Sequence, residues 1–365
     1  MQKRKRMDVN SPEARAILEE ISRTTFTREG LMIAFPTCLP GETLPIVHDE
    51  SRITALAVTR DGMIYGGTSG RRAHVFGANF HGLSGFVLDL GAVEKATDCV
   101  AVCCGPSKVV AFLNGPQGGR IYTTPPASLD QDMIQEWGFG RPVLTPVGQW
   151  DSGTRFVHVV ADPAGKMAVG ATTKNVFVMD LESLTLSAGG EVPGSGRLAF
   201  ASSGVVGKDG DGHLWYYDLR AKSLRKRAFP LPRGVWTQPM VWARDATNGR
   251  LYTADAEGSL FSFDESKGFS GPLGRTRLAP VSTMAVTLDG RLFGFCGEGI
   301  AKMFCYEPAK GTVYDLGVAA SVLERRRYGY VFGDAATGRD GEIVFGENDN
   351  GGHLWLYLPK IGSKG

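Results

Sequence analysis

The chain has 365 residues, of which 42% are apolar and 21% are charged, and its formal net charge is +2. These fractions are ordinary for a folded globular protein. The near-neutral balance excludes a global basic field that would attract nucleic acid or anionic lipid, so neither a nucleic-acid partner nor a membrane partner is expected. The 49 glycines are dispersed without a collagen period, which indicates many tight turns between short strands.

The N-terminal segment differs from the rest of the chain. Ser11-Pro12-Glu13 has the order of N-cap residue, first-turn proline and early acid that begins a helix. We therefore expect a helix or partly ordered arm over residues 12–22, within an N-terminal arm of residues 1–25. The basic start has no apolar segment behind it, so no secretory signal is predicted and a cytoplasmic location is expected.

From about residue 53 onward, one pattern of four short strands recurs. Its first copy spans residues 53–93, and the clearest later copy spans residues 281–322. Both copies have an Asp-Gly hairpin turn after their first strand and a closing Asp-Leu-Gly. The turn glycines Gly249 and Gly290 stand about one propeller blade apart, on a usual scale of roughly 40–45 residues. The recurrence indicates internal repeats.

The repeats predict an all-β fold, a seven-bladed β-propeller with a short N-terminal helical arm. The propeller domain is expected over residues 26–361, and residues 26–37 are expected to add a closing strand to the last blade, which would remove an exposed sheet edge. The blades are expected near 53–93, 96–150, 154–192, 196–232, 236–278, 281–322 and 328–361. A pair of β-sandwiches is the alternative, but it does not explain the repeated Asp-Leu-Gly.

The six cysteines show no matched pairs at zinc-binding spacing. Buried thiols in a reducing compartment are therefore expected. Asp209-Gly210-Asp211 lacks the rest of a calcium loop and is interpreted as a turn. We expect no metal and no organic cofactor.

The candidate functional residues lie in loops that a propeller would place together on one face, around its central funnel. The catalytic candidates are His74, His48 and Tyr330, and the substrate-binding candidates are Arg71, Arg72, Arg327 and Trp236. Arginine binds carboxylates through paired hydrogen bonds, while histidine and tyrosine transfer protons. Each type also has a structural interpretation: solvated loop charges for the arginines, a half-buried and satisfied histidine for His74, and packing between blades for Tyr330.

The segment Ile64–Gly70, followed by Ala73–Phe76, resembles the first-blade signature of bacterial seven-bladed propeller polysaccharide lyases, of the ulvan lyase and rhamnose–glucuronate lyase type. The resemblance implies β-elimination next to a uronic acid. It implies that His74 is the catalytic histidine, that Tyr330 donates a proton, and that Arg72 or Arg327 neutralises the carboxylate. The chain differs from that family in lacking an export signal, so a smaller acidic sugar or oligosaccharide is the expected partner.

Three functions are open at this point, because propellers support unrelated chemistries. The first is a lyase or related carbohydrate-active enzyme. The second is a non-catalytic propeller binding module for a protein or sugar partner. The third is a hydrolase or lactonase with a metal in the funnel. The sequence does not determine the oligomeric state.

Overall fold

The computed structural model describes residues 11–12, 15, 30–36, 46–81, 84–126, 143–149, 153–194, 196–236, 239–321 and 328–360. These residues contain the strands β1 to β28 and the short 3-10 helix η2 (His48–Glu50). Most of the helix expected over residues 12–22 lies outside the described residues. Within the described ranges, no helix is long and apolar enough to cross a membrane.

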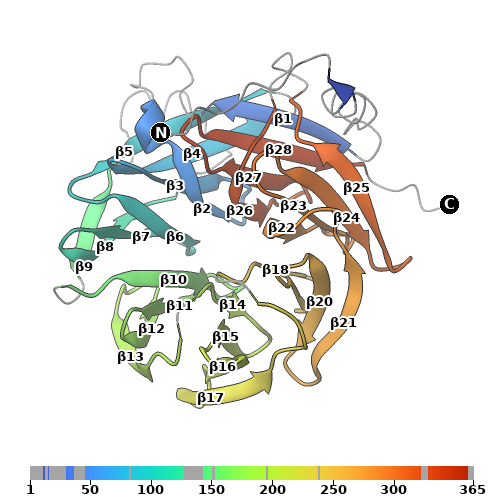
Figure 1. The fold of residues 1–365 in the computed structure, drawn as a ribbon. Helices are drawn as coiled ribbons and strands as arrows, with labels where there is room; N and C mark the ends of the chain where they lie inside the picture. The colour runs from blue at the N-terminus through green and yellow to red at the C-terminus, as the bar shows by residue number, and fades with distance from the viewer. Residues whose placement is uncertain are drawn as a thin grey trace.

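The strands pair into six sheets, five with four strands and one with eight. Each group of four is an antiparallel meander. Figure 1 shows the first strand of each group facing a common centre and the fourth strand lying at the rim, which is the arrangement of a β-propeller. The eight-stranded sheet consists of two such groups, connected through the single pair Ser69 and Asp98.

The strands fall into four classes by their position in the groups. The inner strands are β2 (Arg52–Val58), β6 (Asp98–Cys104), β10 (Phe156–Ala161), β14 (Ala199–Phe200), β18 (Trp242–Arg244), β22 (Val281–Val286) and β26 (Phe332–Thr337). The second strands are β3 (Ile64–Ser69), β7 (Val109–Gly115), β11 (Met167–Thr172), β15 (Gly204–Lys208), β19 (Leu251–Ala254), β23 (Leu292–Cys296) and β27 (Ile343–Glu347). The third strands are β4 (Ala73–His81), β8 (Gly118–Thr124), β12 (Asn175–Asp180), β16 (His213–Asp218), β20 (Ser259–Asp264), β24 (Lys302–Glu307) and β28 (His353–Pro359). The outer strands are β5 (Ser84–Val93), β9 (Thr145–Gln149), β13 (Leu186–Glu191), β17 (Ser223–Pro230), β21 (Gly268–Arg275), β25 (Thr312–Val318) and β1 (Gly30–Pro36).

The N-terminal strand β1 closes the ring. It runs antiparallel to β28, in a register from Gly30 opposite Pro359 to Pro36 opposite His353. This pairing confirms the closing strand expected within residues 26–37. It gives the last group its fourth strand and covers what would otherwise be an exposed edge of β28.

The core lies in layers between neighbouring groups. One layer packs Phe112 of the second group against Phe156 and Phe177 of the third, and the ring centroids of Phe112 and Phe156 are 5.4 Å apart. Such layers are filled by the inward-facing residues of each strand, since alternate side chains point to opposite faces of a sheet. The apolar runs of the repeats therefore supply the packing that holds the ring together.

Close packing in these layers explains why the strands contain glycine. Gly66 on β3 lies opposite Phe76 on β4, and a Cβ at position 66 would lie 2.2 Å from Cζ of Phe76.

We expect Gly66→Ala to lower the free energy of unfolding by about 1–3 kcal/mol, because the ring of Phe76 would have to move within a filled core. Urea unfolding measures this change. Gly210→Ala is the matched control, since a Cβ there meets no atom within 4 Å, and equal stabilities of the two variants would contradict the explanation.

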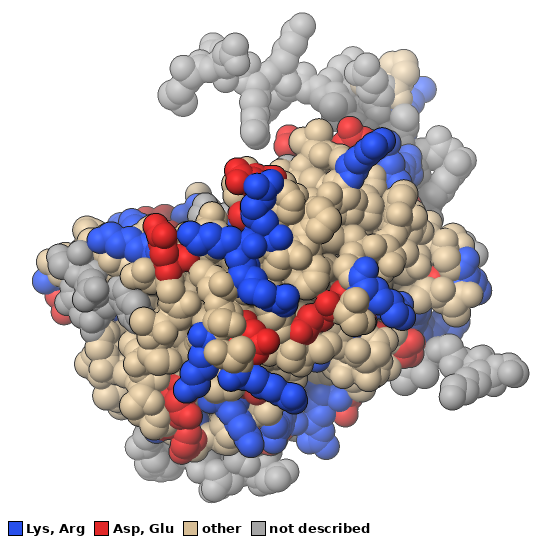
Figure 2. Space-filling view, turned by 90° about the horizontal axis from the view of Figure 1, so that it is seen from below, with Lys and Arg blue, Asp and Glu red and all other residues tan. Residues whose placement is uncertain are grey.

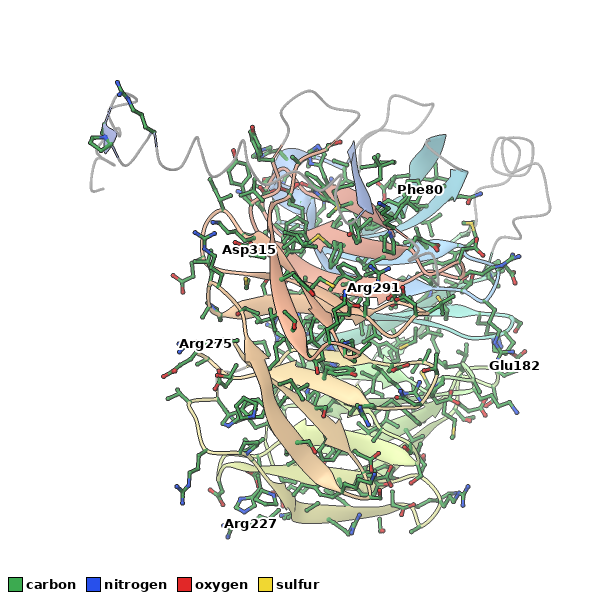
Figure 3. The ribbon with its side chains drawn as sticks, turned by 90° about the vertical axis from the view of Figure 1, so that its right-hand side faces the viewer. Phe80, Glu182, Arg227, Arg275, Arg291 and Asp315 are labelled. Atoms are coloured by element: carbon green, nitrogen blue, oxygen red, sulfur yellow. The ribbon has the colours of Figure 1, made fainter. Side chains whose placement is uncertain are left out.

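The antiparallel meander gives the ring two different faces. The turn face contains the turns between first and second strands and between third and fourth strands. The connection face contains the loops between second and third strands and the links between groups. In Figure 3, Glu182, in the turn between β12 and β13, and Arg275, at the end of β21, project from opposite sides of the molecule. A functional site therefore belongs to one face or to the channel between them.

The cysteines of the described residues form no disulfide bonds. Cys99, Cys103, Cys296 and Cys305 are buried, and Cys104 is half-buried. Burial raises the pKa of Cys99 to about 12, so its thiol is not a reactive nucleophile at neutral pH. The expectation of buried thiols is confirmed for these four residues, while Cys38 lies outside the described residues.

Candidate functional site

Arg71, Arg72 and His74 converge on a single carboxylate, that of Glu50. Arg72 donates from Nε to Oε1 at 2.8 Å and from Nη2 to Oε2 at 2.9 Å, and Arg71 donates from Nε to Oε1 at 2.9 Å. Nε2 of His74 lies 2.9 Å from Oε2 of Glu50, and its Nδ1 lies 3.0 Å from Oδ2 of Asp89. The side chain of Glu50 is completely buried and that of His74 is 5% exposed.

The charges in this cluster reinforce one another. The hydrogen bond from Arg72 is the largest cause that lowers the pKa of Glu50 to about 2, against the opposing effect of burial. Burial would lower the pKa of His74, but the hydrogen bonds and charges of Asp89 and Glu50 raise it overall. A protonated histidine donates from both ring nitrogens, so His74 has no free nitrogen to abstract a proton. The contacts favour the structural interpretation of His74.

The raised pKa of His74 predicts a specific pH dependence of stability. The imidazolium is stabilised by carboxylates only in the folded protein, so its contribution is complete below the ordinary pKa of 6.5 and is lost as pH rises through the folded-state pKa. We expect the stability difference between the native protein and His74→Gln to shrink as pH rises above about 6.5. Urea unfolding from pH 5.5 upward, with His213→Gln as control, measures it, and a difference that grows with pH would contradict the ion-pair account.

The other predicted residues do not join this cluster through any contact of their side chains that the structure describes. His48 begins η2 and is exposed. Trp236 packs against Phe261 at a centroid distance of 5.3 Å, and its Nε1 donates to the carbonyl of Pro232 at 2.9 Å. Arg327 lies outside the described residues.

Tyr330 lies beside a second buried carboxylate. Tyr330 is 45% exposed to solvent. Its backbone nitrogen donates a hydrogen bond to Oε1 of Glu347 at 3.1 Å. Glu347 also accepts from Nε1 of Trp355 at 3.2 Å. Among the described residues, no hydrogen bond or ion pair connects His74 to His48, Tyr330 or Trp236. The structure thus brings together Arg71, Arg72 and His74, but in a closed cluster.

A cavity of about 650 Å³ lies at the centre of the ring. Residues of the inner strands β2, β6, β10, β14 and β18 line it, together with the turns at 59–61, 105–106 and 162–165 that follow three of them. It therefore extends through the channel toward the turn face. None of the described residues predicted for the site lines this cavity.

Three ionisable side chains line the cavity at the end away from these turns. Arg197, which precedes β14, donates from Nη2 to the carbonyl of Gly333, and its Nη1 lies 4.0 Å from Oδ1 of Asp334 on β26. Because β14 and β26 belong to groups that are not neighbours, this contact crosses the centre of the ring (Figure 1). The side chains of Arg197 and Asp334 are 23% and 28% exposed, so both are accessible to a bound molecule.

Burial shifts the pKa values of His158 and Asp334, and in both it favours the neutral form of the side chain. Nδ1 of His158 accepts a hydrogen bond from the backbone nitrogen of Leu198 at 3.1 Å, which leaves the proton on Nε2. Burial, with a smaller effect of Arg197, lowers the pKa of His158 to about 3, so the ring is a neutral hydrogen-bond donor. Burial raises the pKa of Asp334 despite the opposing charge of Arg197. Its carboxyl can therefore both accept and release a proton.

Sequence reasoning missed these three residues because it concentrated on long loops. His158 lies within the apolar strand Phe156–Ala161, and Arg197 and Asp334 occur in no recognisable motif. The available signal was a polar residue within an inner strand of a propeller, where one side of the strand faces the channel. Among the described residues there is no group of three His, Cys, Asp or Glu side chains suited to hold a metal ion.

The charged outer surface is a second candidate for a binding site. Figure 2 shows Lys and Arg side chains lying among Asp and Glu side chains on the face seen from below. The outer strand β17 contributes exposed Arg225, Lys226 and Arg227, and Lys226 lies 3.5 Å from the carboxylate of Glu191. Such exposed pairs contribute little free energy, so the surface charges are weaker evidence of a site than the cavity.

The fold and the channel define a β-propeller, and the comparisons with known proteins agree. The structure is similar to that of a catalytically inactive variant of virginiamycin B lyase from Staphylococcus aureus, determined with quinupristin. The TM-score is 0.60 at 9% sequence identity, over 90% of this chain and 99% of the other. At this identity the likeness shows the shared propeller fold alone. No family model and no curated protein matches the sequence.

Proposed function

We propose that this chain is a propeller lyase that binds a carboxylate-bearing substrate in the central cavity and cleaves it by β-elimination. The observation that carries the proposal is the contact of Arg197 with Asp334 across the channel, beside the neutral ring of His158. These residues supply a cation for a carboxylate, a carboxyl with a raised pKa and a fixed hydrogen-bond donor. The volume of about 650 Å³ is in the range of small-molecule sites.

The proposed reaction uses only these side chains. Arg197 binds the substrate carboxylate and stabilises the negative charge that develops on it when the neighbouring carbon loses its proton. Ionised Asp334 accepts this proton, the released electron pair forms the carbon–carbon double bond, and the carbon–oxygen bond at the next carbon breaks. Asp334 then returns the proton to the departing oxygen, toward which Nε2 of His158 can donate a hydrogen bond.

The number of blades and the class of substrate are part of the same proposal. We count the eight-stranded sheet as two blades, because only the pair Ser69 and Asp98 connects its halves, and this count gives seven blades. We propose a uronic acid within an acidic oligosaccharide as the substrate class. The resemblance of Ile64–Gly70 to propeller polysaccharide lyases supports this choice.

Product formation tests this proposal directly. Incubation with glucuronate-containing oligosaccharides is expected to produce the ultraviolet absorbance of an unsaturated uronate. Asp334→Asn is expected to lower the rate by at least about 100-fold, the usual contribution of a proton-transferring side chain. The control is Asp211→Asn, which changes an exposed turn outside the cavity. Folded protein that gives no product across the panel, or full activity of Asp334→Asn, would overturn the mechanism, and capture of the sugar without product would favour the binding module instead.

A further inference from the structure

Residues 219–233, which include the outer strand β17, contain six cationic side chains and no acidic one. All six residues are exposed, and they are Arg220, Lys222, Arg225, Lys226, Arg227 and Arg233. We call this surface the basic rim, and Figure 3 shows its member Arg227 at the outer edge of the ring. Although the net charge of the chain is only +2, positive charge gathers on this part of the rim, where it attracts anions locally.

Few charges of the basic rim are used within the protein. The ammonium group of Lys226 lies 3.5 Å from the carboxylate of Glu191, and Cζ of Arg225 lies 4.7 Å from the ring centroid of Tyr216. In the part of the chain that the structure describes, no acid pairs with the side chains of the other four residues. Their donors are therefore available to an anion from outside the protein.

A bulge in β17 shapes the basic rim. Residues 226–228 together lie opposite the single residue Trp215 of β16. Arg227 has a φ of 52°, a conformation that costs free energy in residues other than glycine. Bulges at sheet edges redirect side chains and interrupt the regular edge. An extended peptide therefore finds no regular strand edge to pair with here, and this favours a ligand that is recognised by side chains.

An aromatic cavity of about 520 Å³ adjoins the basic rim, since Phe229 of β17 lines it two positions after Arg227. Its lining includes three aromatic residues and two prolines, which are Phe229, Phe261, Phe269, Pro230 and Pro232. Phe229 and Phe269 are half-buried, and Trp236 packs against Phe269 at a ring-centroid distance of 6.0 Å. Supported aromatic faces of this kind suit the C–H faces of a sugar ring. The exposed Lys267 adds a cation to the lining.

We propose that the basic rim and the aromatic cavity form a binding surface for an acidic polysaccharide chain, outside the central cavity. The cations bind uronate carboxylates, for which the planar donors of arginine are well suited, and the aromatic cavity takes a sugar ring. The choice of a uronate chain rests on the proposed function. The surface itself is independent of the proposed active site, because none of its residues lines the central cavity.

Isothermal titration calorimetry with polyglucuronate and with polyglutamate of matched charge tests the proposal. The full chain carries Asp334→Asn in every titration, so that the proposed reaction does not consume the ligand. Polyglucuronate is expected to bind at least about 5-fold more tightly than polyglutamate, because only the polysaccharide offers sugar rings to the aromatic cavity.

Two variants test the two parts of the surface. The double substitution Lys226→Gln and Arg227→Gln is expected to weaken polyglucuronate binding about 10-fold, which corresponds to the loss of two exposed ion pairs. Phe269→Leu is expected to weaken it about 5-fold and to leave polyglutamate binding unchanged, because it removes an aromatic face and no charge.

Matched controls lie on other blades. Lys174, between β11 and β12, and Arg339, between β26 and β27, are exposed cations, so Lys174→Gln with Arg339→Gln removes the same charge elsewhere. Phe80 is a half-buried aromatic residue on β4, so Phe80→Leu is the control for Phe269→Leu. Both controls are expected to keep the parent affinity, and thermal unfolding verifies that every variant is folded.

The outcomes separate this surface from the proposed active site. Equal affinity for the two polymers, or folded protein that binds neither, overturns the proposal. Unchanged affinity in both test variants also overturns it, and the cations then only protect the edge of β17 from aggregation. If Arg197→Gln alone abolishes binding, the chain binds in the central cavity and only the proposed function stands. If both test variants weaken binding but the native chain forms no unsaturated product, the surface stands and the lyase function fails.

Discussion

Glu50→Gln is expected to lower the free energy of unfolding by about 3 kcal/mol, the lower end of the loss when one partner of a buried ion pair is removed, because it deletes the buried negative charge that Arg71, Arg72 and His74 share while Asp89 still contacts His74. Arg72 would lose a bidentate partner, and His74 would lose the acceptor that lies 2.9 Å from its Nε2. The amide of glutamine keeps the size of the side chain but carries no charge, so Asp89 is left as the carboxylate that contacts His74. The effect is therefore electrostatic and does not arise from a cavity.

Urea unfolding of Glu50→Gln and of its neighbour Asp49→Asn measures this contribution. Asp49 also lies in η2 and contacts Arg71 at 3.4 Å, but its side chain is 59% exposed. An exposed pair of this kind contributes at most about 1 kcal/mol. Equal effects of the two substitutions would show that burial of Glu50 does not strengthen the cluster, and the structural interpretation of His74 would fail with it.

Arg197→Gln is expected to lower the lyase rate by about 100- to 1,000-fold, the usual loss when a group that stabilises developing negative charge is removed. Arg197→Lys keeps the charge but loses the planar pair of donors, so an intermediate rate is expected. Arg155→Gln is the control, since Arg155 forms a half-exposed pair with Asp98 at 3.0 Å and does not line the cavity.

The pH profile of Arg197→Gln separates a role in catalysis from a role in folding. The charge of Arg197 lowers the pKa of Asp334 against the effect of burial. Without that charge, the pKa of Asp334 rises further, so the acidic limb of the rate profile is expected to move to higher pH. A variant that is folded and has the native rate and profile would contradict the role assigned to Arg197.

Much of the fold was predictable because it depends on local patterns. Short apolar runs separated by Asp-Gly turns predict hairpins, and their repetition predicts a ring of sheets. The first predicted unit, 53–93, corresponds to β2 through β5. The closing strand β1 was also predictable, because an apolar segment precedes the first repeat and the last repeat lacks a fourth strand. The helical arm is still a prediction, since nearly all of it lies outside the described residues.

The candidate site was less predictable because its contacts are long-range. Arg71, Arg72 and His74 are near one another in sequence, but the sequence does not show that Glu50 saturates them. Arg197 and Gly333 are 136 positions apart, and no local pattern indicates that an arginine before one inner strand reaches across the ring to another. Which polar residues face the channel depends on how the whole ring assembles, so the sequence alone does not bring these residues together.

A crystal structure of Asp334→Asn with a glucuronate-containing oligosaccharide tests the central claim, that the ring binds its substrate in the channel and not on the connection face. The variant should retain binding while product formation is blocked. The account predicts a uronate carboxylate beside Arg197, within the cavity lined by β2, β6, β10, β14 and β18. A sugar bound instead on the connection face, against Arg71, Arg72 or Tyr330, would contradict it.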